Sequence, residues 1–255
     1  MTLEILTIPC LDDNYAFLAH DAGTGQTLLV DVPEAAPIAQ TLTSQGWTLS
    51  HVLLTHHHAD HVGGLSALLA DHPATVIGAA ADAHRLPALD LAVADGQTFD
   101  FAGLACHVMD VSGHTVGHIA VHIPAASAVF TADSLMALGC GRLFEGTPDQ
   151  MWASLSKLAA LPADTVVYSG HEYTAANAKF ALSVDPTNPR LISRSADIDT
   201  ARQSGRPTVP STLAEELATN PFLRAADPAI RAGLGMQDAS DAAVFAEVRA
   251  LKDRF

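Results

Sequence analysis

The sequence is poor in cysteine. Only three cysteines occur in 255 residues, Cys10, Cys106 and Cys140, and they are far apart in the chain. An odd number of widely spaced cysteines is not a disulfide framework, so we expect a reducing compartment. None of the three has a paired base that the sequence makes evident. The sequence therefore does not predict a cysteine nucleophile.

Basic residues are also scarce. Lysine and arginine together number 13, against 28 aspartates and glutamates, and the formal net charge at pH 7 is −15. Nonspecific binding to nucleic acid or to an anionic membrane surface requires a basic face, so we expect neither kind of partner. An acidic average still allows a small local basic patch.

Long apolar runs are absent as well. No stretch approaches the roughly 18 consecutive apolar residues of a membrane span. The first residues, MTLEILTIPCLDDNY, lack the basic start and the long apolar segment of a signal peptide. Because 49% of the residues are hydrophobic, the chain can bury a substantial core. We therefore expect a cytoplasmic globular protein, and a monomer.

The first two thirds of the chain alternate short apolar runs with turn signals. Nine runs have the length and the branched residues of strands: 3–9, 15–20, 27–32, 50–55, 74–79, 104–111, 118–124, 127–132 and 165–170. Helical patterns occur at 34–46, 63–73 and 147–162, and the last of these begins with the capping residue Thr147 followed by Pro148. Many strands with fewer helices favour an α/β sandwich over a doubly wound sheet.

The pattern changes after about Tyr173. Helical patterns follow at 174–185, 188–205, 211–220 and 238–255, and strand patterns stop. The third begins with a capping box that uses Ser211 or Thr212. We therefore predict two domains, an α/β domain over residues 1–172 and a small all-helical domain over residues 173–255.

The most informative stretch is THHHADH, which follows the fourth apolar run. Its spacing is His-x-His-x-Asp-His, formed by His56, His58, Asp60 and His61. Just after a strand the chain is nearly extended, so the side chains at 56, 58 and 60 can share one face while His57 points the other way. His61 then opens a helix. A His-rich exposed loop is the alternative interpretation, in which these side chains bind nothing.

Three more ligand candidates stand at the ends of other apolar runs. They are His114, Asp133 and His171. Open α/β sheets gather their sites at the ends of strands, so we expect these side chains to join the histidine cluster. His118 competes with His114 for the same role, but it lies further along the chain, and we expect a supporting role for it.

The predicted set of five histidines and two aspartates is too large for one ion. Imidazole with carboxylate suits zinc, iron or manganese, and the lack of thiolates argues against a closed structural zinc site. Two metals that share a carboxylate would use the whole set, and such a pair supplies hydroxide at neutral pH and polarises a carbonyl or phosphoryl oxygen. The sequence therefore predicts a binuclear metallohydrolase.

These motifs resemble a known superfamily. THHHADHVGG, SGHTVGH, FTADSL and YSGHEYT are similar in order and spacing to the motifs of the metallo-β-lactamase superfamily. Within it, CLDDNYAFL, GCGRLFEGTPDQMWASL, GHEYTAANAKFA, NPFLR and VRALKDRF resemble hydroxyacylglutathione hydrolase, or glyoxalase II. The resemblance extends from about Ile8 to Phe255. It implies a four-layer αβ/βα sandwich followed by a small all-helical domain that binds glutathione.

The resemblance also implies a role for each ligand candidate. The first metal would be held by His56, His58 and His114, and the second by Asp60, His61 and His171. Asp133 would bridge the two, and Asp60 and Asp133 would be the catalytic carboxylates. Zinc is the expected metal, with iron or manganese as alternatives.

Glutathione would be bound by Arg142, Tyr173, Arg249 and Lys252, whose three cations would form the local basic patch. Arg249 and Lys252 could instead be a solvated helix end, where positive charge suits the helix dipole. Phe144 stands where the family often has a tyrosine, so a hydroxyl is missing. We expect weaker or reshaped binding of glutathione there, not a loss of chemistry.

The implied reaction is hydrolysis of S-(2-hydroxyacyl)glutathione thioesters, chiefly S-D-lactoylglutathione, to glutathione and D-lactate in methylglyoxal detoxification. Asp60 would orient the attacking hydroxide. Alternatives are a mononuclear iron glutathione persulfide dioxygenase and another thioester or lactone hydrolase of the superfamily. The long helical C-terminal region argues against the dioxygenase. The net charge of −15 argues against a nuclease.

Overall fold

The computed structural model describes residues 3–255, which divide into two compact units. Unit 1 consists of residues 3–110 and 116–132, and unit 2 consists of residues 111–115 and 133–255. The chain therefore leaves unit 1 for five residues before it returns, and leaves it finally after Ala132. None of the helices formed by residues 3–255 is both long and apolar enough to cross a membrane.

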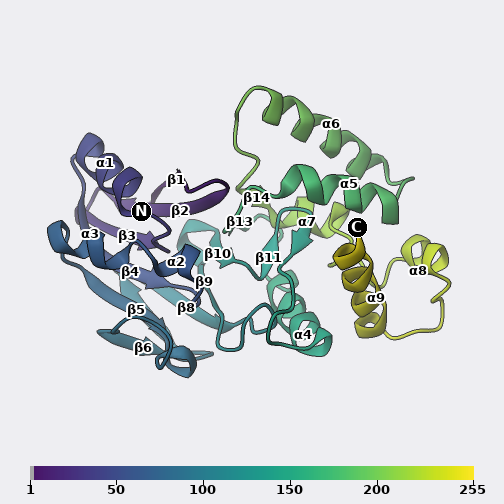
Figure 1. The fold of residues 1–255 in the computed structure, drawn as a ribbon, viewed down its shortest axis with the longest axis horizontal. Helices are drawn as coiled ribbons and strands as arrows, with labels where there is room; N and C mark the ends of the chain where they lie inside the picture. Colours follow the sequence, from purple (N-terminus) through teal and green to yellow (C-terminus); the bar gives the residue numbers. More distant parts are fainter. Residues whose placement is uncertain (1–2) are drawn as a thin grey trace. The chain divides into compact units, whose positions relative to one another are not determined.

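Unit 1 contains a six-stranded mixed sheet whose strand order follows the sequence, in the purple and blue part of Figure 1. Its strands are β1 (Glu4–Cys10), β2 (Asn14–Asp21), β3 (Gln26–Val30), β4 (Thr48–Leu54), β5 (Thr75–Ala79) and β6 (Leu91–Val93). The pairs β1–β2 and β2–β3 are antiparallel, and the remaining pairs are parallel. Every residue of β2 is buried, as expected for a strand covered on both faces.

A second set of strands in unit 1 forms an antiparallel ladder. It consists, in sequence order, of β7 (Thr98–Phe101), β8 (Leu104–Asp110), β9 (Ile119–Ile123) and β10 (Ala128–Ala132). The ring of Phe17 on β2 lies 5.9 Å from the ring of Phe130 on β10, and His51 on β4 meets Phe101 on β7 edge to face at 5.6 Å. The two sheets therefore pack face to face around the core of unit 1.

Three helices make two of the three connections between parallel strands. α1 (Ala35–Gln45) joins β3 to β4, and α2 (Ala59–Val62) and α3 (Leu65–Asp71) lie between β4 and β5. Gly64 separates α2 from α3. A Cβ atom at this position would lie 2.8 Å from the backbone nitrogen of Ala35, so only glycine allows this close approach of the two backbones.

Unit 2 is mainly helical. Its helices are α4 (Pro148–Ala159), α5 (Thr174–Val184), α6 (Pro189–Gln203), α7 (Leu213–Thr219), α8 (Pro228–Leu234) and α9 (Asp241–Arg254). Two short antiparallel pairs accompany them, β11 (Leu135–Met136) with β12 (Gly139–Cys140) and β13 (Val166–Ser169) with β14 (Ser211–Thr212). Aromatic side chains from different elements build its core. The rings of Phe180 and Phe222 lie 5.8 Å apart, and those of Phe222 and Phe245 lie 6.1 Å apart.

All nine predicted strands are present, with ends shifted by a residue or two. The seven predicted helices are present as well. Capping boxes fix the starts of α4 and α7, at Thr147 with Gln150 and at Thr212 with Glu215, so Thr212 is the capping residue of the predicted pair. The expectation that strands stop after Tyr173 is wrong at Ser211–Thr212. These two residues precede the helix in extended conformation and pair with β13.

Candidate metal centre

Two of the four clustered histidines lie together at the end of β4. The Nε2 atom of His56 is 3.1 Å from the Nδ1 atom of His58, and both residues are in the extended segment before α2. His57 points elsewhere, and its Nδ1 atom lies 2.9 Å from the Oδ2 atom of Asp82. The predicted alternation of side chains is therefore confirmed for these three histidines.

The extended geometry predicted for Asp60 is wrong, because α2 begins at Ala59. Asp60 lies in the first turn of this helix beside His61, and its Oδ2 atom is 3.7 Å from the Nε2 atom of His61. The same oxygen accepts a hydrogen bond of 3.1 Å from the Nδ2 atom of Asn14. The side chain of Asp60 is 42% exposed, so Asn14 holds a carboxylate that solvent can reach.

Asp31, which follows β3, was not among the residues predicted from the sequence. Its Oδ2 atom lies 2.8 Å from the Nδ1 atom of the fully buried His61. Thr55 donates to the same carboxylate from its backbone nitrogen and from its hydroxyl. A carboxylate on Nδ1 leaves Nε2 as the coordinating atom of the imidazole, which is the usual arrangement of metal-binding histidines. An acidic residue at the end of the apolar run TLLVDV was the available signal.

His118 supports the cluster, as expected from the sequence. Its ring is fully buried and stacks on the ring of His56, with centroids 4.6 Å apart and planes inclined by 14°. Its Nδ1 atom lies 3.1 Å from the carbonyl oxygen of Ile119. The stacking fixes the plane in which His56 can present its nitrogen.

Unit 2 brings together the other three predicted ligands. The Oδ2 atom of Asp133 lies 3.4 Å from the Nε2 atom of His114 and 3.3 Å from the Nε2 atom of His171. All three residues are buried. They come from three separate loops, so this convergence on one carboxylate oxygen arises only in the folded chain.

The hydrogen bond of His114 defines the tautomer of its neutral ring. Its Nδ1 atom lies 2.8 Å from the backbone carbonyl oxygen of Arg142, and a carbonyl oxygen can only accept. In the neutral imidazole the Nε2 atom therefore carries a lone pair, which faces the carboxylate of Asp133. Two electron-rich atoms at this separation need a cation or a proton beside them. A donor set of this kind fits a divalent metal ion with oxygen and imidazole ligands.

The backbone of Gly141 packs closely against Asp133 and His114. A Cβ atom at this position would lie 2.0 Å from the carbonyl oxygen of Asp133 and 3.0 Å from the Nδ1 atom of His114. No other residue fits there without displacing the backbone. The CGR segment therefore packs directly against two of the predicted ligands, Asp133 and His114, besides carrying the predicted glutathione contact Arg142.

Two exposed aromatic side chains flank the histidines of unit 2. The ring of Tyr173 stacks on the ring of His171, with centroids 4.7 Å apart and planes inclined by 6°. The ring of Phe144 meets His114 edge to face at 5.2 Å. Phe144 is 61% exposed and Tyr173 is 40% exposed, so both rings are partly open to solvent beside the buried histidines.

The three predicted cations differ in exposure. Arg142 is mostly exposed, whereas Arg249 is only 6% exposed and donates from Nη1 to the carbonyl oxygen of Cys140 at 2.9 Å. The sequence analysis missed Asp253, whose Oδ1 atom lies 2.9 Å from Arg249 Nη2 and 3.6 Å from Arg142 Nε. Partial burial, and then the charge of Arg249, lower the pKa of Lys252 below its ordinary value of 10.5.

The three cysteine thiols are unreactive at neutral pH. All three are free and buried. Burial raises the pKa of Cys10 and of Cys140 to about 11, and that of Cys106 to about 12. Their thiols stay protonated at neutral pH, which agrees with the prediction that no cysteine acts as nucleophile.

Comparison with known proteins identifies the family. The model of the metallo-β-lactamase superfamily matches residues 13–171, and the model "Hydroxyacylglutathione hydrolase C-terminus" matches residues 172–255. A hydroxyacylglutathione hydrolase of Roseobacter denitrificans is 72% identical over 255 residues, and one of Ruegeria pomeroyi is 69% identical over 255 residues. Each alignment covers 100% of both chains.

Among solved structures, ETHE1 from Myxococcus xanthus is similar with a TM-score of 0.69 and 26% identity, over 98% of this chain and 90% of that chain. The chain thus has the metallo-β-lactamase fold followed by a helical C-terminal region, as predicted. Its class is that of the metallo-β-lactamase superfamily. Within this superfamily the chain belongs to the hydroxyacylglutathione hydrolase family.

Proposed function

We propose that this chain hydrolyses S-(2-hydroxyacyl)glutathione thioesters, chiefly S-D-lactoylglutathione, to glutathione and D-lactate. The observation that carries the proposal is the likeness of the whole chain to hydroxyacylglutathione hydrolases, at 72% and 69% identity. This hydrolysis would be a step of methylglyoxal detoxification. We further propose that the enzyme is a cytoplasmic monomer, with a catalytic domain over residues 1–172 and a glutathione-binding domain over residues 173–255.

We propose that seven side chains hold two divalent metal ions, with zinc as the expected metal. The first ion would be held by His56, His58 and His114, the second by Asp60, His61 and His171, and Asp133 would be shared by both. The buried imidazole and carboxylate donors of each unit support this arrangement. Metal ions in such a site lower the pKa of water and stabilise negative charge on a carbonyl oxygen.

Asp60 is proposed to orient the attacking water and to accept its proton. Its carboxylate is partly exposed and is held by the side-chain amide of Asn14, so it can present one oxygen in a fixed direction. Attack on the acyl carbon expels the thiolate of glutathione. A thiol with a pKa of about 8.5 is a good leaving group, so the reaction needs no strong general acid.

Binding of glutathione is proposed to rest on Arg142, Tyr173 and Lys252 at the surface of unit 2, with Arg249 behind them. Arg142 and Lys252 offer positive charge to the carboxylates of the tripeptide. Tyr173 and Phe144 present exposed rings next to His171 and His114, where the thioester has to lie. Holding the substrate there makes attack on the acyl carbon effectively intramolecular.

The test is turnover of S-D-lactoylglutathione by zinc-loaded protein, followed by the loss of thioester absorbance. We expect rapid hydrolysis by the wild type, and a loss of at least about 100-fold in kcat in an Asp60→Asn variant, as is typical when an acid–base group is removed. Absence of hydrolysis, together with oxygen uptake on addition of glutathione persulfide, would replace the proposal by a dioxygenase activity.

A further inference from the structure

The hairpin β11–β12 connects two parts of the candidate metal centre. It begins directly after Asp133 and Ser134, and it ends at Gly141 and Arg142. The backbone nitrogen of Gly141 donates to the carbonyl oxygen of Ser134 at 3.1 Å, which closes the base of the hairpin. The carbonyl oxygen of Arg142 accepts from His114. The shape of this hairpin therefore fixes where Asp133 and His114 lie.

Asn220, in the NPFLR segment, holds both strands of the hairpin. Its side-chain Nδ2 atom lies 3.1 Å from the carbonyl oxygen of Met136 and 3.0 Å from the carbonyl oxygen of Gly139. Its Oδ1 atom accepts a hydrogen bond of 3.0 Å from the backbone nitrogen of Phe222. Asn220 is fully buried, so water does not replace these contacts.

Glu216, one helical turn before Asn220, holds the tip of the hairpin. Its Oε2 atom accepts a hydrogen bond of 2.9 Å from the backbone nitrogen of Leu138. Ser211 and Arg194 donate to its Oε1 atom. The carboxylate is fully buried, and Arg194 compensates its charge from α6.

Side chains from two more helices donate hydrogen bonds to the hairpin. Asn177 on α5 donates to the carbonyl oxygen of Ala137 at 3.1 Å, and Arg249 on α9 donates to that of Cys140. Four carbonyl groups and one amide between Met136 and Cys140 are thus satisfied by side chains from helical segments.

A hairpin of this length would not keep its shape alone. Two-stranded pairs are marginally stable in water, and each strand here has only two residues. Leu138 has a φ of 55°, a left-handed conformation that costs free energy in a residue other than glycine. Each buried peptide group left without a partner would cost about 1–3 kcal/mol. The helical side chains therefore determine the conformation.

We propose that Asn220 and Glu216 are positioning residues of the metal centre, acting through the β11–β12 hairpin on Asp133 and His114. The inference rests on the proposed function, in which Asp133 and His114 are metal ligands. It gives the helical region a second task besides binding glutathione, because the region then also sets the geometry of the metal ligands.

The prediction is tested by metal release, which does not depend on turnover. Asn220→Ala removes both hydrogen bonds to the hairpin, so zinc should pass to a chromogenic chelator about 10–100-fold faster than from the wild type, the effect usual for groups that orient metal ligands. In the cobalt-substituted variant the visible absorption bands should also change. Asn188→Ala is the matched control, because Asn188 bonds to Ala218 and caps α6 without touching the hairpin.

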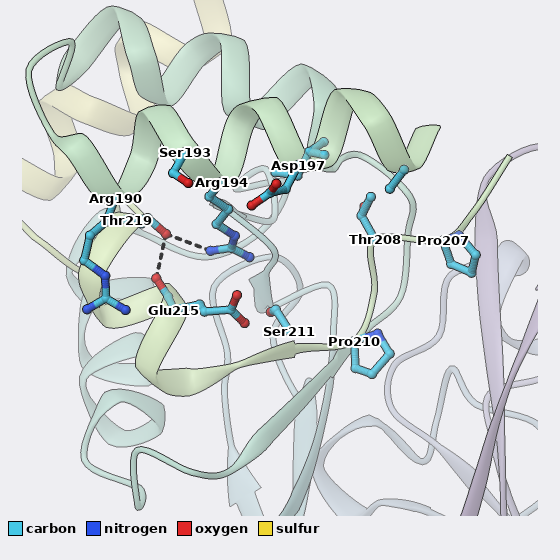
Figure 2. A pocket seen from close by; sticks show the side chains of 12 residues that line it. Arg190, Ser193, Arg194, Asp197, Pro207, Thr208, Pro210, Ser211, Glu215 and Thr219 are labelled. Carbon is cyan, nitrogen blue, oxygen red and sulfur yellow. Dashed lines mark hydrogen bonds between the residues drawn. The ribbon is translucent and has the colours of Figure 1, made fainter. Parts of the chain in front are cut away.

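A second pair of variants gives an independent test that does not depend on the folding of Asn220→Ala. Arg194 and Arg190 stand one turn apart on α6 and line the same cavity, as Figure 2 shows. The volume of this cavity is about 380 Å³. Arg194→Met removes a donor from Glu216, whereas Arg190→Met changes the same cavity wall without touching this carboxylate. Arg194→Met should accelerate metal release, although less than Asn220→Ala does. Arg190→Met should leave the release rate unchanged.

The outcomes separate this inference from the proposed function. Wild-type protein that holds no metal and does not hydrolyse the thioester would overturn the proposed function itself. Wild-type protein with two metals, together with release rates in Asn220→Ala and Arg194→Met equal to those of the controls, would overturn only the positioning role.

Discussion

The Nδ1 atom of His114 lies 2.8 Å from the backbone carbonyl oxygen of Arg142, while the side chain of Arg142 is 60% exposed and faces solvent. The backbone of this residue therefore orients a proposed metal ligand, whereas its guanidinium, whose Nε atom lies 3.6 Å from Asp253 Oδ1, is the proposed substrate contact. Because a substitution changes the side chain and keeps the carbonyl group, the two tasks can be separated by experiment.

Arg142→Ala should raise KM for S-D-lactoylglutathione and leave the metal content unchanged. An exposed charged hydrogen bond is worth about 1 kcal/mol, so the increase should be about fivefold. Steady-state kinetics with metal analysis of the same samples measure both quantities. Arg190→Ala, an exposed arginine outside the proposed glutathione site, is the control and should have the KM of the wild type. A loss of metal in Arg142→Ala would contradict this division of tasks.

Two buried aspartates that each contact a histidine offer a matched comparison. Asp31 lies 2.8 Å from His61, a proposed ligand, and Asp82 lies 2.9 Å from His57, which is outside the ligand set. Asp31→Asn should weaken metal binding by about 10–100-fold, because the amide no longer supports His61 as a charged acceptor.

Asp82→Asn should leave metal affinity unchanged and lower the free energy of unfolding by about 1–3 kcal/mol, since Arg85 and His57 both lose their charged partner. Competition with a chelator measures the first quantity, and urea denaturation measures the second. A loss of metal affinity in Asp82→Asn as large as that in Asp31→Asn would show that His57 belongs to the site.

Gly141→Ala should destroy the site although it adds only a methyl group. The new Cβ atom would lie 2.0 Å from the carbonyl oxygen of Asp133, so the backbone of the ligand has to move. Misplacement by about 1 Å can lower kcat about 100-fold. Gly233→Ala is the control, since the nearest atom to its Cβ is 4.0 Å away and alanine favours the helix. Wild-type kcat in Gly141→Ala would contradict the described geometry.

Glutathione binding should weaken at alkaline pH. Because burial and the nearby Arg249 lower the pKa of Lys252 below 10.5, Lys252 loses its charge at a lower pH than an exposed lysine. The affinity for a non-hydrolysable S-alkylglutathione, measured by calorimetry, should therefore fall as pH rises through this lowered pKa. Lys252→Arg should retain its affinity in that range. A wild-type affinity that does not change up to pH 10.5 would exclude Lys252 from the binding site.

The same pKa shift affects stability in the opposite direction. A lysine whose pKa is lower in the folded chain binds its proton less tightly there than in the unfolded chain. Its burial therefore opposes folding at neutral pH, and this cost disappears as pH rises from the folded to the unfolded pKa.

Local spacing made part of the site predictable. His56, His58, Asp60 and His61 are close in sequence, so their proximity required only the period of a strand and a helix start. The resemblance to hydroxyacylglutathione hydrolases supplied the pairing of His114, Asp133 and His171, which no local pattern contains. Among these four residues, only the start of α2 was predicted wrongly. The helix begins at Ala59, and Asp60 therefore lies beside His61 in its first turn.

The groups that hold these predicted ligands carry only weak sequence signals or none, and were not predicted. Asp31 is a single acidic residue at a strand end, and the carbonyl oxygen of Arg142 is present whatever the side chain. Asn220 contacts residues more than eighty positions away. The short strands β6 and β14 were missed for a related reason. Two or three residues carry too little periodicity, and pairing with a neighbour defines them.

The most direct test is metal titration of apo-protein with zinc, with S-D-lactoylglutathione hydrolysis measured at each addition. Our account predicts that full activity requires about two equivalents of zinc per chain, because imidazole and carboxylate donors are provided for two ions. Full activity at one equivalent, or hydrolysis without metal, would contradict the binuclear centre.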